Sequence, residues 1–205
     1  MLTLLLIISG ATFAMQVEQH AAPQSMPTSQ LKDFDEDSTV VKKLITTALA
    51  LANQNLTYKY GSADPKAGGM DCSGTINYLL TEMGVKDVPR QSDTIYQWVW
   101  QQGHFYAVNS TTMNSFEFKY LKPGDLLFWT GTYDIKRDPP ITHVMLYLGK
   151  NLQGQPLMFG ASNGRTYQGK SIWGVSVFDF VLPQPSAPSR FLGYGCIPNL
   201  TCNTQ

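Results

Sequence analysis

Charge is scarce in this sequence. Only 15 Lys and Arg and 15 Asp and Glu occur among 205 residues, so the formal net charge at pH 7 is zero. No basic or arginine-rich run is present, so the sequence shows no electrostatic footprint for a nucleic-acid partner. Internal repeats and low-complexity tracts are also absent. A chain of this length is suited to one well-packed domain rather than two.

A long hydrophobic run is missing as well. The apolar residues 1–14 end in small residues, with Thr12 and Ala14 placed as at a signal-peptidase site. This run is too short to span a bilayer and is typical of a secretory signal peptide. Because no Lys or Arg precedes it, a buried N-terminal strand is the alternative interpretation. No cysteine follows the run, so a lipoprotein anchor is not expected.

The segment after the apolar run is polar. Residues 15–37 contain proline and show no apolar period, which indicates a flexible linker. We therefore expect a signal peptide over 1–14, a linker over 15–37 and one folded domain over 38–205. The mature protein is expected to be exported, to the periplasm or the cell exterior, without a membrane span.

Helical patterns come first within this domain. Apolar residues recur at helical spacing over 41–51, with Ser38 as the N-cap. A second helix is expected to begin at Cys72 and to end at Gly84. A third is expected near residue 92, with Ser92 as its cap.

Strand patterns follow the helices. Five short aromatic or β-branched segments are separated by Gly and Pro, which is typical of strands. Residues 131–142 form a polar insertion between two of them and are expected to be a surface loop. This order predicts an α+β fold, with N-terminal helices packed on a mostly antiparallel sheet of about five to six strands. The expected strands lie within residues 125–130, 143–149, 156–162, 174–182 and 190–197.

Cysteine is rare, with three residues in the chain. Cys196 and Cys202 lie close together around a Pro-Asn turn, and an exported chain tends to oxidise such a pair. A Cys196–Cys202 disulfide would leave Cys72 unpaired. Free cysteines are usually buried and inert, but an unpaired thiol in an exported protein is also a candidate reactive group.

Cys72 stands where a helix is expected to begin. The unpaired N–H groups and the dipole of a helix N-terminus favour a thiolate and lower the thiol pKa. The same N–H groups could hold an oxyanion. Gly74, two residues on, is expected to leave room for a substrate carbonyl.

Histidine is equally rare, which narrows the choice of a base. His20 lies in the expected linker, and His104 lies in a glycine-flanked loop. His143 begins an expected strand, from which a rigid sheet could direct its ring at a helix end. By elimination His143 is the better base or ion-pair partner for Cys72, although a histidine at a strand edge is often only a surface residue.

Several motifs resemble those of a known family. The stretch "YKYGSADPKAGGMDCSGTINYLL" resembles the signature of the NlpC-type family of bacterial cell-wall cysteine peptidases, which are papain-like. Further matches occur in the same order as in that family, and together they cover about residues 38–196. They are "VPRQS", "LKPGDLLFW", "THVMLYLG" and "FLGYGCI".

The resemblance implies roles for individual residues. Cys72 corresponds to the nucleophile and His143 to its base. Asp71 and Ser92 could instead be ordinary helix N-caps. The positions implied to shape the substrate pocket or to lie near the same cleft are Tyr58, Asp71, Ser73, Arg90 and Ser92.

The third catalytic position departs from the family pattern. The family usually places a polar residue, often His, on the strand after the catalytic histidine, and here that position falls on Gly160. Ser162 should face the same side of a regular strand, whereas Asn163 could reach the ring if the strand bulges. Asn163 has the better hydrogen-bonding group and is the predicted third residue. If neither side chain reaches the ring, the site is a dyad.

The resemblance implies a papain-like cysteine peptidase that hydrolyses amide bonds in peptidoglycan stem peptides, often the γ-D-glutamyl to diamino-acid bond. The expected partner is the stem peptide, and the protein is expected to be a monomer. No metal or organic cofactor is implied, because one cysteine and one strand histidine make no metal-ligand set. The alternatives are a catalytically silent module that binds cell-wall peptide and a papain-like acyltransferase.

Overall fold

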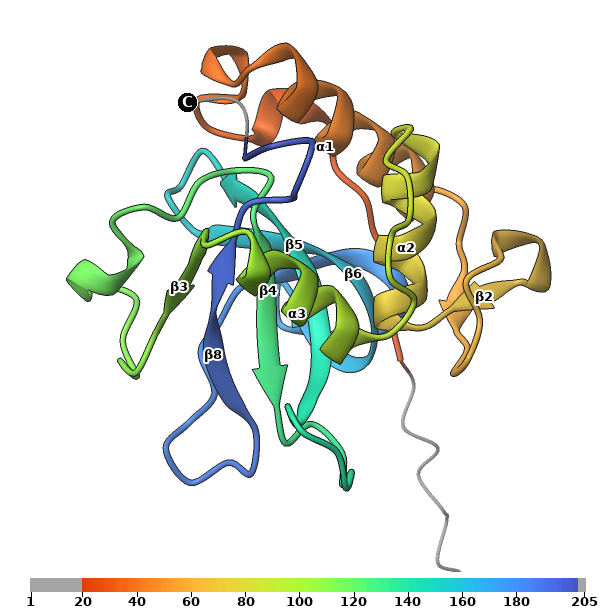
Figure 1. Ribbon diagram of the computed structural model, residues 1–205. Coiled ribbons are helices and arrows are strands. Elements are labelled where there is room, and N and C mark those ends of the chain that lie inside the picture. The colour runs from red at the N-terminus through yellow and green to blue at the C-terminus, as the bar shows by residue number, and fades with distance from the viewer. Residues whose placement is uncertain (1–19, 203–205) are drawn as a thin grey trace, which may run out of the picture.

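A computed structural model describes residues 20–202, and Figure 1 shows helices packed around a central antiparallel sheet. The expected signal peptide, residues 1–14, lies outside the described residues. The sheet has six strands in the order β3-β8-β4-β5-β6-β7, and every neighbouring pair is antiparallel. The strands are β3 Phe105–Ala107, β4 Leu126–Thr130, β5 Ile141–Lys150, β6 Pro156–Tyr167, β7 Lys170–Asp179 and β8 Arg190–Gly195.

The α+β fold with a mostly antiparallel sheet is therefore confirmed. Strand β3 was not among the expected strands, and neither was the small parallel pair of β1 Thr57–Tyr58 and β2 Gly69–Met70. These strands have two or three residues each, too few to show a period in the sequence.

Three α-helices pack against the sheet, namely α1 Thr39–Ala52, α2 Cys72–Glu82 and α3 Ser92–Gln101. Helices α2 and α3 contact β5, and α1 contacts β6 and β7. The Ser38 side chain caps α1 as predicted, by accepting a hydrogen bond from the Val41 N–H. The predicted cap of α3 is wrong, because Gln91 is the N-cap and Ser92 is the first helical residue. Short 3-10 helices are η1 Thr28–Gln30, η2 Phe34–Glu36, η3 Pro65–Ala67 and η4 Phe116–Phe118.

Residues 20–37 pack against the domain, where a flexible linker was expected. Met26 and Leu31 in this segment are buried in the core. The Gln24 carbonyl accepts a hydrogen bond of 2.9 Å from the Val177 N–H of β7. Strand β7 is at the edge of the sheet, so this segment covers N–H groups that would otherwise be unpaired. Such pairing depends on a distant strand, and no local apolar period signals it.

The central strands are apolar on both faces. Phe128 of β4 meets Tyr96 of α3 at a ring separation of 5.5 Å. The neighbouring Trp129 points to the other face, where its ring lies 5.0 Å from that of Phe191. Successive residues of a strand alternate between faces in this way. Because His143 pairs with Trp129 across the β4–β5 ladder, its ring lies on the Trp129 face.

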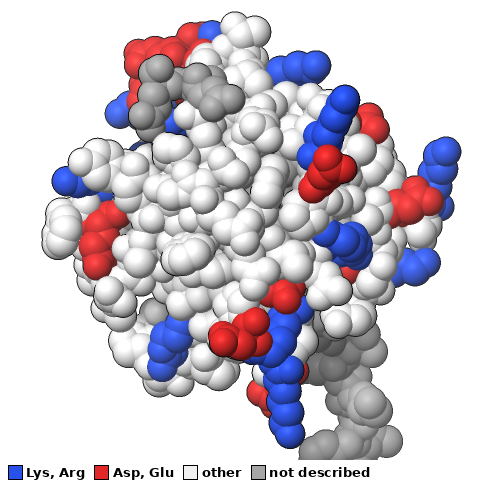
Figure 2. All heavy atoms as spheres, in the orientation of Figure 1, with Lys and Arg blue, Asp and Glu red and all other residues white. Residues whose placement is uncertain are grey.

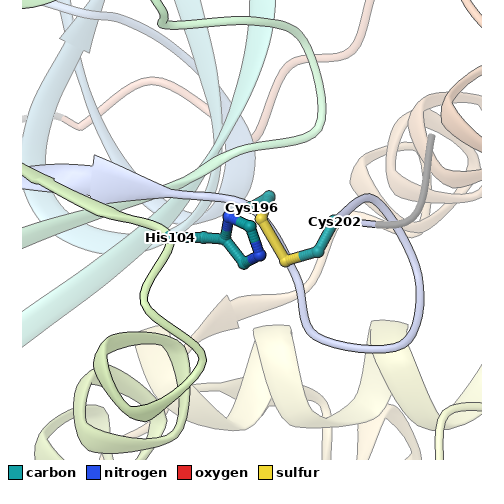
Figure 3. Close-up of side chains that lie close together, drawn as sticks. All are labelled: His104, Cys196 and Cys202. Carbon is teal, nitrogen blue, oxygen red and sulfur yellow. A yellow bond between two sulfur atoms is a disulfide. The ribbon is translucent and has the colours of Figure 1, made fainter. Parts of the chain in front are cut away.

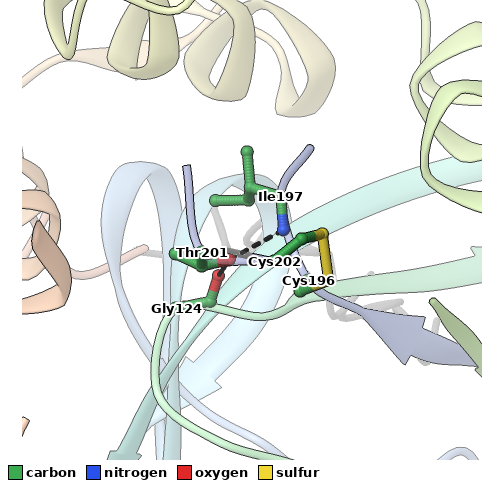
Figure 4. Close-up of a disulfide and its surroundings, with 5 residues drawn as sticks. All are labelled: Gly124, Cys196, Ile197, Thr201 and Cys202. Carbon is green, nitrogen blue, oxygen red and sulfur yellow. Dashed lines mark hydrogen bonds between the residues drawn. A yellow bond between two sulfur atoms is a disulfide. The ribbon is translucent and has the colours of Figure 1, made fainter. Parts of the chain in front are cut away.

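The tail after β8 is closed by the predicted disulfide between Cys196 and Cys202, which leaves Cys72 free. Figure 4 shows Thr201 inside this loop, where its hydroxyl accepts a 2.7 Å hydrogen bond from the Ile197 N–H. The hydroxyl also bonds the Gly124 carbonyl at 3.4 Å, which ties the tail to the start of β4.

Candidate active site

Cys72 is the first residue of α2, directly after the capping residue Asp71. The Asp71 carboxylate accepts hydrogen bonds from the Gly74 N–H at 2.6 Å and the Gly61 N–H at 2.8 Å. The first bond is an N-cap, so the N-cap interpretation of Asp71 is confirmed. The second bond ties the loop after β1 to the start of the helix. Asp71 therefore sets the position of the predicted nucleophile relative to that loop.

Gly74 has a different role from the expected one. A Cβ atom at this position would overlap the backbone carbonyl of Ser62. The space beside Gly74 is therefore filled by the protein's own loop and is not open to a substrate carbonyl. Glycine is needed here because two backbone segments approach each other closely.

Arg90 completes the network around Asp71. Its Nη2 lies 2.8 Å from Asp71 Oδ2, and its Nη1 lies 3.1 Å from Asp71 Oδ1 and 3.0 Å from Ser73 Oγ. The two bonds to the carboxylate form a bidentate pair, a geometry that fixes orientation as well as adding charge attraction. Three of the residues that sequence analysis associated with the pocket are thus joined in one network.

The Cys72 thiol is buried, with 6% of the residue exposed. Its Sγ lies 3.9 Å from the carbonyl oxygen of Thr142, the residue immediately before His143. Burial and the negative charge of Asp71 raise the pKa of the Cys72 thiol to about 11, against the opposing effect of nearby backbone N–H groups, including that of Val144. The thiol is therefore neutral at pH 7 in the free protein, although the helix terminus alone favoured a lowered pKa.

The His143 side chain is also buried. Its ring centroid lies 5.8 Å from that of Trp129, in an edge-to-face arrangement. Its Nε2 atom lies 3.3 Å from the Nε atom of Arg165. Burial, followed by the positive charge of Arg165, holds the pKa of His143 well below its usual value. Both predicted reacting groups are thus uncharged at neutral pH.

Arg165 was not among the predicted site residues, and a β-bulge explains why. Asn163 pairs with Trp173, but Arg165 pairs with Ile172, so the ladder shifts at Gly164. The paired residues on β7 point to opposite faces, and Asn163 and Arg165 therefore do as well. Gly164 has a φ of +139°, a conformation that favours glycine.

The bulge decides which side chain reaches the ring. A Cβ at Gly160 would overlap the Sδ atom of Met145, so residues 160 and 162 share the face of Met145 and His143. Before the bulge, Asn163 faces away and is exposed; after it, Arg165 returns to the His143 face. Of the described residues, Arg165 makes the one hydrogen bond to the ring, which corrects the prediction of Asn163 as the third residue. Ser162 is buried near the ring but is not bonded to it.

Two grooves that share lining residues contain the predicted catalytic residues, Cys72 in one and His143 in the other. The first, which we call the Cys72 groove, has a volume of about 340 Å³. The second, the His143 groove, has a volume of about 690 Å³. Both are lined by Tyr58, Tyr60 and Tyr133. The predicted residues in the Cys72 groove are Tyr58, Asp71, Cys72, Ser73, Arg90 and Ser92, and those in the His143 groove are Tyr58, His143, Ser162 and Asn163.

Two of the shared tyrosines were missed by sequence analysis. The rings of Tyr60 and Tyr133 meet edge to face at a centroid distance of 6.5 Å. Tyr60 is 75% exposed and borders both grooves, so its ring is accessible to a ligand there. Tyr133 belongs to the polar insertion that was expected to be only a surface loop, and nothing in its sequence indicated a contact with the site.

The insertion is held against α3 by Arg137. Its guanidinium lies 3.2 Å from Asp93 Oδ1 and 3.0 Å from Ser92 Oγ, and it also bonds the Ile141 carbonyl. The Ser92 hydroxyl donates to the same carbonyl at 3.0 Å. Ser92 thus links α3 to the beginning of β5 instead of capping the helix.

One cluster of metal-binding residue types occurs among residues 20–202, away from the grooves. It consists of His104, Cys196 and Cys202, and Figure 3 shows the imidazole beside the disulfide. Metal ions bind cysteine as the thiolate, so the two sulfur atoms could become ligands only after reduction.

Charges are sparse on the surface. On the face drawn in Figure 2, Lys and Arg are interspersed with Asp and Glu among larger uncharged areas, without a continuous basic patch. Within residues 20–202, no helix combines the length and the apolar character needed to cross a bilayer.

Comparison with known families agrees with this arrangement. The NlpC/P60 family matches residues 55–172, more than half of the chain, and this segment includes Cys72, His143 and Arg165. The chain belongs to the NlpC/P60 family. The predicted family is therefore confirmed, and its members are generally cell-wall peptidases.

One NlpC/P60 structure has a similar fold. It is described as similar to a lipoprotein of the NLP/P60 family, from Staphylococcus aureus subsp. aureus Mu50, and it superposes with a TM-score of 0.52 at 19% sequence identity. The match covers 89% of this chain but 46% of that one, so this chain spans less than half the length of its structural relative. At this identity the similarity supports the fold alone. No curated protein sequence matches the chain.

Proposed function

We propose that this NlpC/P60 protein is a cysteine peptidase that hydrolyses amide bonds in peptidoglycan stem peptides. The observation that supports it best is the position of Cys72, at a capped helix N-terminus with its sulfur against the backbone next to His143. Cys72 borders the Cys72 groove, which shares three tyrosines with the His143 groove, so an extended peptide that occupies both grooves would pass it. Family membership supplies the substrate class, and the bond proposed is that between γ-D-glutamate and the diamino acid.

The reaction uses the two side chains in sequence. Cys72 Sγ attacks the amide carbonyl as its proton passes to His143, and N–H groups of the first turn of α2 stabilise the oxyanion. The imidazolium then donates that proton to the departing amine, and a thioester remains on Cys72. Water attacks the thioester with His143 accepting its proton, and the acid product leaves as the thiol is restored.

Other residues would bind the peptide. Tyr58 borders both grooves. The Asp71–Arg90–Ser73 network presents polar atoms to the Cys72 groove. These groups are proposed to bind the acyl side of the substrate, which leaves the His143 groove for the amine side.

Export and the domain boundary are also proposals. The Cys196–Cys202 disulfide favours an oxidising compartment, which agrees with a signal peptide over residues 1–14 and with a location in the periplasm or outside the cell. Because residues 20–37 pack on the sheet, we propose that the peptidase domain begins before residue 38. A monomer would suffice, since both reacting residues belong to one chain.

The decisive experiment compares Cys72→Ala with the wild type on purified muropeptides, analysed by mass spectrometry. The wild type should produce a new amine terminus and a new acid terminus, and the variant should produce neither. His143→Ala should also be inactive. His104→Ala is the matched control, because this histidine lies beside the disulfide and borders neither groove, so it should retain activity.

The same measurement separates the alternatives. A wild-type protein that leaves every muropeptide unchanged but still binds it would be a silent binding module. A product carrying an added acyl group on an amine or alcohol would identify an acyltransferase. Hydrolysis by Cys72→Ala at the wild-type rate would refute the role proposed for Cys72.

A further inference from the structure

Arg165 has no carboxylate partner among the residues that the structure describes. The salt bridges among residues 20–202 join Arg90 to Asp71 and Arg137 to Asp93. Arg165 instead lies over the ring of Trp129, 4.3 Å from its centroid, and bonds His143. Burial lowers the pKa of Arg165 to about 10, so the guanidinium stays charged at neutral pH. The described lining of the His143 groove contains no Asp or Glu.

The direction of the Arg165–His143 hydrogen bond follows from chemistry. A guanidinium has donors and no acceptor, so its Nε–H donates and His143 Nε2 must accept with a lone pair. A neutral imidazole carries one proton, which must then be on Nδ1. The contact therefore selects the Nδ1–H tautomer of His143. An amide oxygen or carboxylate at this position would accept a proton from Nε2 and select the opposite tautomer.

This tautomer opposes catalysis as long as the contact lasts. One ring nitrogen already carries a proton, and the lone pair of the other is used by Arg165. Neither nitrogen can then take the Cys72 proton. An imidazolium in the same place would put two cations and two donors against each other. Arg165 must move before His143 can act as a base.

Other titratable groups do not replace Arg165 in this role. Asp71 of α2 is already paired with Arg90. Tyr58 and Tyr133 border both grooves and Cys72 borders the Cys72 groove, and burial raises the pKa of each. They are therefore neutral at pH 7, and Arg165 is the charged group in contact with the ring.

We propose that Arg165 holds His143 in its neutral Nδ1–H form in the free protein and is drawn off the ring by a carboxylate of the bound peptide. Arg165 is thus a positioning residue that makes proton transfer depend on substrate binding. This inference rests on the proposed function, because stem peptides carry free carboxylates near the bond to be cut. An acid-free groove with one unpaired guanidinium suits such a ligand.

The first test measures the ring itself. Nitrogen-15 NMR of the His143 imidazole, followed over pH, should show the Nδ1–H tautomer in the wild type. In Arg165→Gln the pKa of His143 should rise and the tautomer preference should weaken, whereas Arg165→Lys should stay closer to the wild type. Lys170→Gln is the matched control: it removes a positive charge from the same β6–β7 hairpin at an exposed site and should change neither property.

Two outcomes would overturn the first half of the proposal. One is an Nε2–H tautomer in the wild type, which needs no variant to detect. The other is a His143 titration that is the same in Arg165→Gln and wild type. Both measurements are independent of turnover, so they stand even if the protein fails to hydrolyse muropeptides and the proposed function is rejected.

The second test adds a ligand to the Cys72→Ala protein, which cannot turn it over. The probes are the tripeptide alanyl-γ-D-glutamyl-diaminopimelate and its analogue with every carboxylate converted to a carboxamide. The acid form should raise the pKa of His143 and shift the Arg165 Nε–H resonance, and the amide form should do neither. An equal response to both peptides, or no response to an acid form that calorimetry shows to be bound, would refute displacement by a carboxylate, whereas an acid form that does not bind would count against the proposed function.

Discussion

At Cys72, burial raises the pKa of the thiol more than the helix N-terminus lowers it. A helix N-terminus favours a thiolate, and the backbone N–H groups nearby act in that direction. The carboxylate of Asp71, which caps the same helix, acts against it, and so does the removal of the thiol from water. Because His143 is also held neutral, both side chains are uncharged at rest, and no thiolate–imidazolium pair is preformed.

The pH dependence of alkylation should show this state. Iodoacetamide reacts with the thiolate, whose fraction grows about tenfold per pH unit below the thiol pKa. With that pKa raised to about 11, the rate of Cys72 labelling should still be increasing well above neutral pH. Peptide mass spectrometry gives the rate, and Cys72→Ala, whose other cysteines are disulfide-bonded, should not be labelled. A rate that levels off at or below neutral pH would instead indicate a preformed thiolate–imidazolium pair.

The bulge in β6 is the element that controls the site. Its effect follows from one extra residue, which reverses the alternation of the strand between Asn163 and Arg165. A glycine in the interior of a strand often marks a bulge, and Gly164 does so in β6, although the strand expected from the sequence ended at residue 162. The glycine alone does not show which later side chain faces His143, because that depends on how β6 pairs with β7.

Gly164→Ala tests the bulge, and Gly169→Ala on the same hairpin is its control. Both glycines have positive φ values, +139° and +76°, so both substitutions should lower the free energy of unfolding, by about 1–3 kcal/mol. No atom lies closer than 3.9 Å to a Cβ at Gly164, and none lies within 4 Å at Gly169, so the cost is conformational. Only Gly164→Ala should alter the His143 ring resonances and the muropeptide turnover. Equal effects of the two variants on the ring would argue against the role of the bulge.

The Cys196–Cys202 disulfide is expected to affect the stability of the whole molecule rather than the site. It closes a short loop of the tail, at a sequence separation of 6, so it should stabilise the protein by about 2 kcal/mol. The double variant Cys196→Ser/Cys202→Ser should therefore melt about 4–8 °C lower by differential scanning calorimetry. Neither cysteine borders the two grooves, so turnover at a temperature where the protein is folded should be retained. Loss of turnover in a folded variant would show that the tail supports the site.

Local chemistry was enough to predict much of this molecule. The caps at Ser38 and Asp71 use side chains that bond an N–H three residues ahead, so they are encoded within one turn of helix. The strands were recognisable from their composition, and the Cys196–Cys202 pair from its spacing. The motif around Cys72 and the strand at His143 predicted the family for the same reason, since each is a continuous stretch.

The remaining features depend on contacts between distant segments. Residues 20–37 look like a linker because the β7 edge that they cover lies about 150 residues away. The loop that contains Tyr133 looks like a surface loop because nothing in its own residues indicates that it packs against α3. Arg165 reaches His143 only because the ladder between β6 and β7 shifts at Gly164. Strand register is set by the packing of whole elements, so only the tertiary structure could place a guanidinium, and not the Asn163 amide, on the ring.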